Sequence, residues 1–155
     1  MNIHIVKNTL SENGSVKRGV CEQKDGKLTR IVEHVFVFCR EDEFKTFKAN
    51  KKVTSVRKTG QKMYENVYNF IEAKNNDGSC KLNKATYSTD LMTQLMDIYV
   101  QPNSLVYDPF MGTGTTANAC ILKGMNYLGS EISQAQVDYA NDRLIMTLES
   151  IEEKN

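Results

Sequence analysis

The sequence predicts an α/β protein built around a parallel sheet. Three observations support this prediction: strand and helix patterns alternate over residues 104–155, a glycine turn joins the first strand to its helix, and Glu131 ends the second strand. At 155 residues the chain is long enough for one domain. Because ligands of such sheets bind beyond the carboxyl ends of the strands, the glycine turn marks the predicted site.

The first segment, residues 1–43, predicts two strands. NIHIVK, from residue 2, and RIVEHVFVFCR, from residue 30, are rich in β-branched and aromatic residues, and a polar stretch with Gly14, Gly19 and Gly26 separates them. We expect the two strands to be antiparallel neighbours joined by a long loop.

The second segment, residues 44–82, opens with a basic stretch and then predicts a helix. Residues 44–64 hold seven Lys or Arg and no acid. Met63, Val67, Phe70 and Ile71 recur at helical spacing, so we expect a helix over 61–73 that ends in the turn at 75–78.

The third segment, residues 83–155, predicts a helix followed by a βαβα unit. Ser88, Thr89 or Asp90 begins the helix and Pro102 follows its end. We then expect a strand over 104–109, a helix over 115–123, a strand over 126–131 and a final helix that Ser133 caps with Gln136 in a capping box. The predicted apolar face of that helix consists of Val137, Ala140, Leu144, Leu148 and Ile151.

Composition narrows the class of protein. Hydrophobic residues make up 40% and charged residues 25%, the net charge is +1, and no apolar run approaches the ~20 residues of a membrane span. The N-terminal ten residues lack the apolar core of a signal peptide, so we expect a cytoplasmic protein. The four cysteines and two histidines lack metal-ligand spacing, so we expect reduced thiols and no metal.

The glycine turn suits a ligand that carries a ribose. Gly112 and Gly114 allow a sharp bend and a close backbone approach, and Thr115 and Thr116 open a helix whose N–H groups favour an anionic group. A carboxylate at Glu131 can accept both hydroxyls of a ribose. By spacing alone the turn also satisfies the dinucleotide fingerprint.

The segment Asp108-Pro-Phe-Met-Gly-Thr-Gly-Thr-Thr116 resembles the DPFxGxGTT motif of DNA amino-methyltransferases, which modify adenine N6 or cytosine N4. Gly129-Ser130-Glu131 and the stretch Tyr139–Leu144 are similar to two further motifs of that family. The resemblance displaces the alternative that the dinucleotide fingerprint suggests, a site for a nicotinamide dinucleotide. It implies a Rossmann-like fold and S-adenosylmethionine as cofactor, held by Asp108, Phe110, Gly112, Gly114 and Thr115, with Glu131 on the ribose.

Upstream segments resemble the permuted, β-type order of the same family. Residues 83–88, NKATYS, are similar to the stretch that caps the cofactor, which implies that Thr86 and Tyr87 cover its methionine end. Residues 33–38, EHVFVF, look like a late strand of that fold. The whole chain is therefore expected to be one partial methyltransferase domain.

The catalytic tetrapeptide of the family, Asp-Pro-Pro-Tyr or Ser-Pro-Pro-Tyr, does not occur in this sequence, whose two prolines, Pro102 and Pro109, are not adjacent. We therefore identify no catalytic residue and expect a C-terminal portion with an incomplete sheet. A complementing polypeptide or a homo-oligomer would complete it. The alternatives are a non-catalytic DNA- or cofactor-binding subunit, a truncated remnant and an RNA methyltransferase.

The basic stretch lies where the resembling family often carries target recognition. DNA is the expected partner, and neutralised phosphates would supply much of the affinity. The alternative is a solvated loop and the polar face of a helix. The candidate DNA-binding residues are Lys45, Lys48, Lys51, Lys52, Arg57, Lys58 and Lys62.

Overall fold

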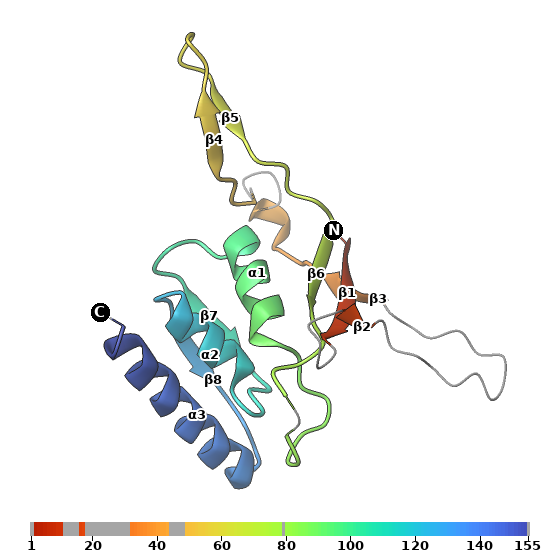
Figure 1. Ribbon diagram of the computed structural model, residues 1–155, viewed down its shortest axis with the longest axis vertical. Helices are drawn as coiled ribbons and strands as arrows, with labels where there is room; N and C mark the ends of the chain where they lie inside the picture. The colour runs from red at the N-terminus through yellow and green to blue at the C-terminus, as the bar shows by residue number, and fades with distance from the viewer. Residues whose placement is uncertain (1, 11–15, 18–31, 44–48, 79, 155) are drawn as a thin grey trace, which may run out of the picture.

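The computed structural model describes residues 2–10, 16–17, 32–43, 49–78 and 80–154. The strands are β1 (Asn2–Leu10), β2 (Val16–Lys17), β3 (Val32–Phe36), β4 (Val53–Val56), β5 (Lys62–Tyr64), β6 (Phe70–Lys74), β7 (Leu105–Asp108) and β8 (Asn126–Gly129). The helices are α1 (Thr89–Tyr99), α2 (Thr115–Leu122) and α3 (Gln134–Glu152), and a 3-10 turn covers Glu41–Glu43. This arrangement confirms the α/β class (Figure 1).

The described strands form three separate sheets. One sheet contains β1, β2, β3 and β6, a second is the β4–β5 hairpin, and the third is the parallel pair β7–β8. The predicted antiparallel pairing of the N-terminal strands is confirmed, because β1 pairs with β3 from Asn2↔Phe36 to Val6↔Val32. The glycines expected in the loop between them lie outside the described residues.

The predicted helix over 61–73 is wrong. Lys62–Tyr64 instead pairs with β4, and Phe70–Lys74 pairs in parallel with β1. Ile71 and Ala73 are buried while Phe70 and its alternate neighbours are exposed, which is the period-two pattern of a strand. The helical spacing of Met63, Val67, Phe70 and Ile71 is a coincidence. The backbone groups of this segment are satisfied by pairing with β4 and β1 instead.

Helix α1 joins the two apolar cores of the described residues. Its predicted start is confirmed, since the Ser88 hydroxyl accepts a hydrogen bond from the N–H of Leu91, and it ends at Tyr99. Leu91 packs with Ile71 and Ala73 of β6. Met96 packs with Ala119 and Cys120 of α2. The helix therefore fixes the N-terminal sheet relative to the βαβα unit.

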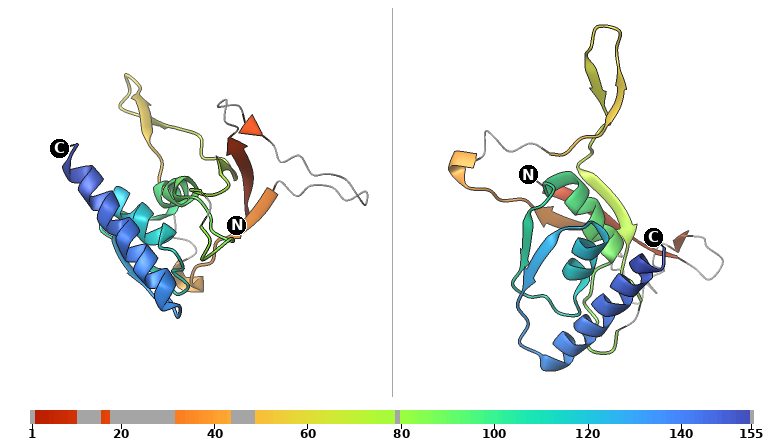
Figure 2. Two further views of the ribbon diagram at one scale, coloured as in Figure 1. Left: turned by 60° about the horizontal axis from the view of Figure 1, so that its bottom comes forward. Right: turned by 90° about the vertical axis from the view of Figure 1, so that its left-hand side faces the viewer.

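The predicted βαβα unit is confirmed, from β7 through α2 and β8 to α3, and its two strands are parallel. Helix α2 is buried from Thr115 to Cys120, and its small residues allow α1 and α3 to pack on both of its sides. The three helices lie on one face of β7–β8 (Figures 1 and 2). On the other face Leu105, Tyr107 and Leu128 are 62%, 57% and 55% exposed.

The final helix differs from its prediction in two respects. Ser133 is the N-cap residue, but its side chain makes no capping hydrogen bond. The amide of Gln136 instead accepts a hydrogen bond from Asn83 at 3.2 Å, so the capping box does not form. Ala140 and Leu144 are buried as expected, whereas Leu148 is 48% exposed because no described element covers the end of the helix.

Within the described ranges, none of the helices combines the length and the apolar character that crossing a membrane requires.

Met96→Ala should destabilise the fold strongly. The side chain is 1% exposed, and loss of a buried methionine with its cavity costs about 2–5 kcal/mol in unfolding free energy. Urea unfolding measures the change. Met146→Ala, at a site 68% exposed on α3, is the matched control and should change stability by less than about 0.5 kcal/mol. Equal losses in both variants would contradict the assigned core.

Candidate cofactor-binding site

The glycine turn has the conformation that its sequence predicts. Gly112 and Gly114 have φ angles of 55° and 81°, in the left-handed region, and Gly114 caps the N-terminus of α2. A Cβ on Gly114 would lie 2.9 Å from the Cβ of Ala140 on α3. Glycine at residue 114 therefore permits both the turn and the close approach of the last helix.

Glu131 holds the turn against the end of β8. Its Oε2 accepts a hydrogen bond from the N–H of Gly112 at 2.8 Å, and its Oε1 accepts one from the N–H of Ser133 at 2.9 Å. The N–H of Met111 donates to the carbonyl of Ser130 at 2.8 Å, beside these bonds. Each carboxylate oxygen keeps a further lone pair, so Glu131 can still accept hydroxyl donors from a ligand.

Asp108 connects the turn to the segment upstream of α1. Its Oδ1 accepts from the N–H of Phe110 at 3.0 Å, and its Oδ2 accepts from the hydroxyls of Thr116 and Tyr87. Burial raises the pKa of Tyr87, the hydrogen bond with Thr116 lowers it in part, and the nearby Asp108 charge raises it again. The Tyr87 hydroxyl also lies 2.6 Å from the Thr116 hydroxyl, whose proton goes to Asp108, so the single Tyr87 proton is shared between Thr116 and the carboxylate.

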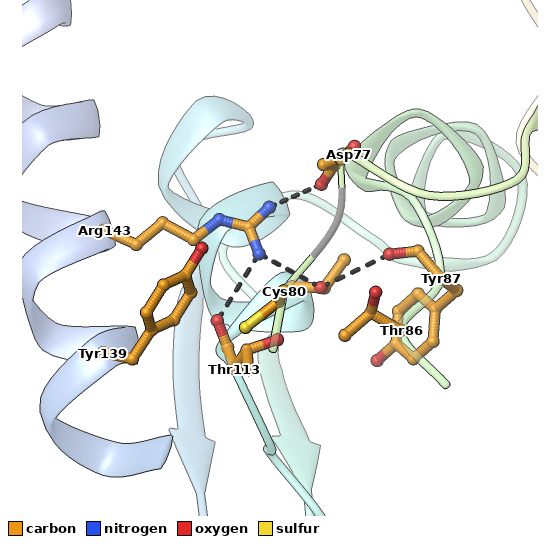
Figure 3. Close-up of a pocket in the computed structure, with 9 residues that line it drawn as sticks. Asp77, Cys80, Thr86, Tyr87, Thr113, Tyr139 and Arg143 are labelled. Carbon is orange, nitrogen blue, oxygen red and sulfur yellow. Dashed lines mark hydrogen bonds and ion pairs between the residues drawn. The ribbon is translucent and has the colours of Figure 1, made fainter. Parts of the chain in front are cut away.

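Arg143 forms a second set of contacts beside the turn (Figure 3). Its Nη2 donates to Asp77 and, at 2.8 Å, to the Thr89 hydroxyl, while its Nη1 donates to the Thr115 hydroxyl at 3.2 Å. One guanidinium thus links α3, the segment before α1 and the first turn of α2. Arg143, Asp77 and Thr115 border a cavity of about 160 Å³. Its lining consists of Asp77, Gly78, Cys80, Thr86, Tyr87, Thr113, Thr115, Tyr139 and Arg143.

A larger, open cavity of about 400 Å³ lies at the strand ends. Its lining consists of Pro109, Phe110, Ser130, Glu131 and Ile132. Phe110 is 86% exposed and Ile132 is fully exposed, so both present apolar surface next to the Glu131 carboxylate. This combination suits a ligand with a flat apolar part attached to hydroxyl groups.

The structure brings the predicted cofactor residues together. Asp108, Phe110, Gly112, Gly114 and Glu131 meet at the turn, the Thr115 hydroxyl donates to the carbonyl of Tyr87 at 3.4 Å, and Thr86 lines the smaller cavity. The candidate DNA-binding residues lie elsewhere. Lys51, Lys52, Arg57, Lys58 and Lys62 are on the β4–β5 hairpin and its base, and Lys45 and Lys48 lie outside the described residues.

Sequence reasoning missed the roles of Thr116, Asp77 and Arg143. Arg143 belongs to a motif that was matched to the family, but the motif gave it no partner. Its signal is a basic residue one helical turn after Tyr139 on a helix whose neighbours, Ala140 and Leu144, are buried. Asp77 was assigned only to a turn, because 66 residues separate it from Arg143 along the chain.

A parallel βαβ unit with a glycine turn and a carboxylate at the end of its second strand is typical of Rossmann-like folds that bind nucleotides. The chain belongs to the DNA methylase family, whose profile matches residues 2–142. M.BamHII, an orphan methyltransferase of Bacillus amyloliquefaciens, is 52% identical over 40 residues, which are 26% of this chain and 15% of that protein.

Two solved structures share the fold. The M1.HpyAVI–SAM complex superposes with a TM-score of 0.59 at 22% identity, over 93% of this chain and 60% of that one. The cytosine-N4-specific PvuII DNA methyltransferase superposes with a TM-score of 0.59 at 12% identity, over 90% of this chain and 49% of that one. This sequence therefore spans 60% and 49% of the length of these two structures.

Tyr87→Phe should change how stability depends on pH. Because the folded protein raises the pKa of Tyr87, the unfolded chain loses this proton first, and wild-type stability should fall as pH rises above about 10. The variant should lose about 1 kcal/mol at pH 7 through its missing hydrogen bonds but show a shallower fall above pH 10. Urea unfolding at pH 7 and pH 10.5 measures both effects.

Tyr68→Phe is the control for this prediction, because Tyr68 is 67% exposed. It should follow the wild-type pH dependence. A Tyr87→Phe variant with the wild-type slope above pH 10 would show that the hydroxyl is not held as described.

Proposed function

We propose that this chain is the cofactor-binding part of an S-adenosylmethionine-dependent DNA methyltransferase that acts on adenine N6 or cytosine N4. The observation that carries the proposal is the pair of hydrogen bonds from Gly112 and Ser133 to Glu131. They place a strand-end carboxylate next to the glycine turn, which family membership and the turn sequence together associate with this cofactor.

The described residues fit the parts of S-adenosylmethionine. Phe110 and Ile132 offer exposed apolar surface for the adenine, and Glu131 offers acceptor lone pairs for the ribose hydroxyls. A Cβ on Gly112 would lie 3.3 Å from Asn83, so glycine leaves room at the turn. Thr86 and Tyr87 line the smaller cavity and would cover the methionine end.

The bound cofactor supplies an electrophilic methyl group on a sulfonium. This chain's own residues bind and orient it, because Asp108 fixes the turn while Tyr87 and Arg143 fix the segment that covers the site. Correct placement of a donor relative to an acceptor accounts for a large part of the rate of group transfer.

Capture of the target amine is assigned to polypeptide outside these 155 residues. The amine needs a polar clamp and an aromatic face, and the tetrapeptide that provides them is absent from this sequence. Parallel sheets are covered on both faces, yet Leu105, Tyr107 and Leu128 leave one face of β7–β8 open among the described residues. We infer that the complementing polypeptide, rather than a second copy of this chain, covers this face.

Duplex DNA is the proposed substrate, and the basic residues of the second segment are proposed to contact its phosphates. Five of the seven candidates lie on the described hairpin and its base, and all five are exposed. Such contacts give affinity without sequence preference.

Glu131→Gln should weaken S-adenosylmethionine binding about 10- to 100-fold, because neutral acceptors form weaker hydrogen bonds with hydroxyls than carboxylates do. The amide oxygen can accept from only one of the two backbone N–H groups that Glu131 binds, so circular dichroism of the variant must accompany the titration to show that it is folded. Isothermal titration of the purified chain measures the affinity, and Glu149→Gln on the exposed side of α3 is the control. Wild-type affinity in Glu131→Gln, or no binding by the folded wild type, would overturn the assigned site.

Methyl transfer should require the complementing polypeptide. We expect no transfer of label from S-adenosylmethionine to duplex DNA by the chain alone, and transfer after a polypeptide with the Asp-Pro-Pro-Tyr portion is added. Leu105→Asp/Tyr107→Asp should abolish the reconstituted activity by preventing association, whereas Met146→Asp on α3 should not. Activity of the chain alone would contradict the division of labour. A folded chain that stays inactive with the complement would favour a non-catalytic subunit or a remnant.

A further inference from the structure

The β4–β5 hairpin is a two-stranded ribbon with a well-defined turn. Its strands pair from Val53↔Tyr64 to Val56↔Lys62. At the tip the N–H of Gly60 donates to the carbonyl of Arg57, and the N–H of Arg57 donates to the carbonyl of Gln61, both at 2.9 Å. Gly60 has φ 81°, which matches a three-residue hairpin loop that ends in a left-handed residue.

The ribbon projects from the body of the molecule (Figures 1 and 2). Within the described residues no other helix or strand makes extensive contact with it, and every residue from 51 to 62 is exposed. An isolated two-stranded hairpin is marginally stable in water. The side chains of Val53, Val56 and Tyr64 are 47%, 60% and 51% exposed. The ribbon therefore has surface available for a partner.

The base of the ribbon is fixed to the end of α1. The N–H of Asn50 donates to the carbonyl of Ile98 at 2.7 Å, and its side-chain amide donates to the carbonyl of Val100 at 2.8 Å. Gln101 donates to the side chain of Asn50 at 2.6 Å. The ribbon is therefore an arm with a set direction relative to the core.

The positive charge of the ribbon favours a negatively charged partner. Residues 51–62 hold five basic residues and no acid, which complements a polyanion. Paired strands lie about 4.8 Å apart, and a two-stranded ribbon fits the major groove of B-DNA, which is about 12 Å wide, but not the minor groove, which is about 6 Å wide. From Lys52 to Thr59 the chain spans about 20 Å, more than the groove depth of about 8.5 Å.

The tip carries side chains of the types that can pair with base edges. Arg57 and Gln61 lie on either side of the turn, and Nη1 of Arg57 donates to the Gln61 amide oxygen at 3.2 Å. The remaining guanidinium N–H groups and the Gln61 amide N–H groups can still donate. Arg pairs with the O6 and N7 atoms of guanine, and Gln pairs with adenine, both in the major groove.

We propose that the β4–β5 ribbon enters the major groove of duplex DNA, where Arg57 and Gln61 contact base edges while Lys51, Lys52, Lys58 and Lys62 contact phosphates. The inference rests on the proposed function in taking duplex DNA as the substrate. It adds which element reads the sequence and which groove is read.

Fluorescence anisotropy with a labelled 30-base-pair random-sequence duplex, at 50 to 300 mM NaCl, tests the phosphate contacts. Lys52→Gln/Lys58→Gln/Lys62→Gln should lower affinity and reduce the slope of log affinity against log salt by about 0.9 for each lysine that neutralises a phosphate in the wild type. The matched control, Lys74→Gln/Lys81→Gln/Lys154→Gln, removes three exposed charges elsewhere and should leave the slope unchanged. Equal slopes in the two triple variants, or no duplex binding by the wild type at 50 mM NaCl, would overturn the proposal.

Selection of bound duplexes from a random pool tests the base contacts. The wild type should enrich a sequence motif, and Arg57→Ala/Gln61→Ala should lose preference at one or two positions by about 10- to 100-fold per base pair. Netropsin, which occupies the minor groove, should not displace the wild type. The same enriched motif in the variant, or displacement by netropsin, would contradict major-groove reading by this tip.

The ribbon variants should bind S-adenosylmethionine with wild-type affinity, because none of their residues lies in the cofactor site. Failure of the ribbon proposal with intact cofactor binding leaves the proposed function standing. Failure of cofactor binding by the wild type would instead count against the proposed function itself.

Discussion

The candidate site depends on the hydrogen bonds that the carboxylate of Asp108 accepts. It sits at the end of β7 and accepts hydrogen bonds from the backbone that follows it, from the first turn of α2 through Thr116, and from Tyr87 of the covering segment. Three parts of the chain that meet only in the folded state are oriented by one side chain. Because hydrogen bonds to a charged group are about twice as strong as neutral ones, a residue matched to a cofactor motif also acts as an organiser of the fold.

The same unit shows why an α/β sheet rarely stands as two strands. The helices α1, α2 and α3 bury one face of β7–β8, and the second face keeps Tyr107 and Leu128 more than half exposed. The N-terminal sheet does not close this gap, since it contacts the unit through α1 rather than by strand pairing. The described fold therefore has one helix-covered face, one open apolar face and the candidate site at the carboxyl ends of its two parallel strands.

Much of the site could be predicted from sequence because its signals are local. The left-handed glycines, the strand before them and Glu131 lie close together along the chain, and local turn chemistry determines their arrangement. The error at 61–73 arose where tertiary pairing decided the outcome, since β6 is a strand through its partner β1. The Arg143–Asp77 contact likewise required knowledge of which distant segments meet. The hairpin had a usable signal, a Thr-Gly turn between two short β-rich runs, but the basic residues around it were interpreted only as charge.

Helix α1 has a mechanical consequence that neither site shows alone. Its N-terminus is tied through Thr89 to Arg143 beside the glycine turn, and its C-terminal carbonyls are tied to Asn50 at the foot of the ribbon. Eleven helical residues make a strut of about 16 Å that does not bend easily. The strut therefore holds the foot of the ribbon at a fixed distance and orientation from the residues around the glycine turn.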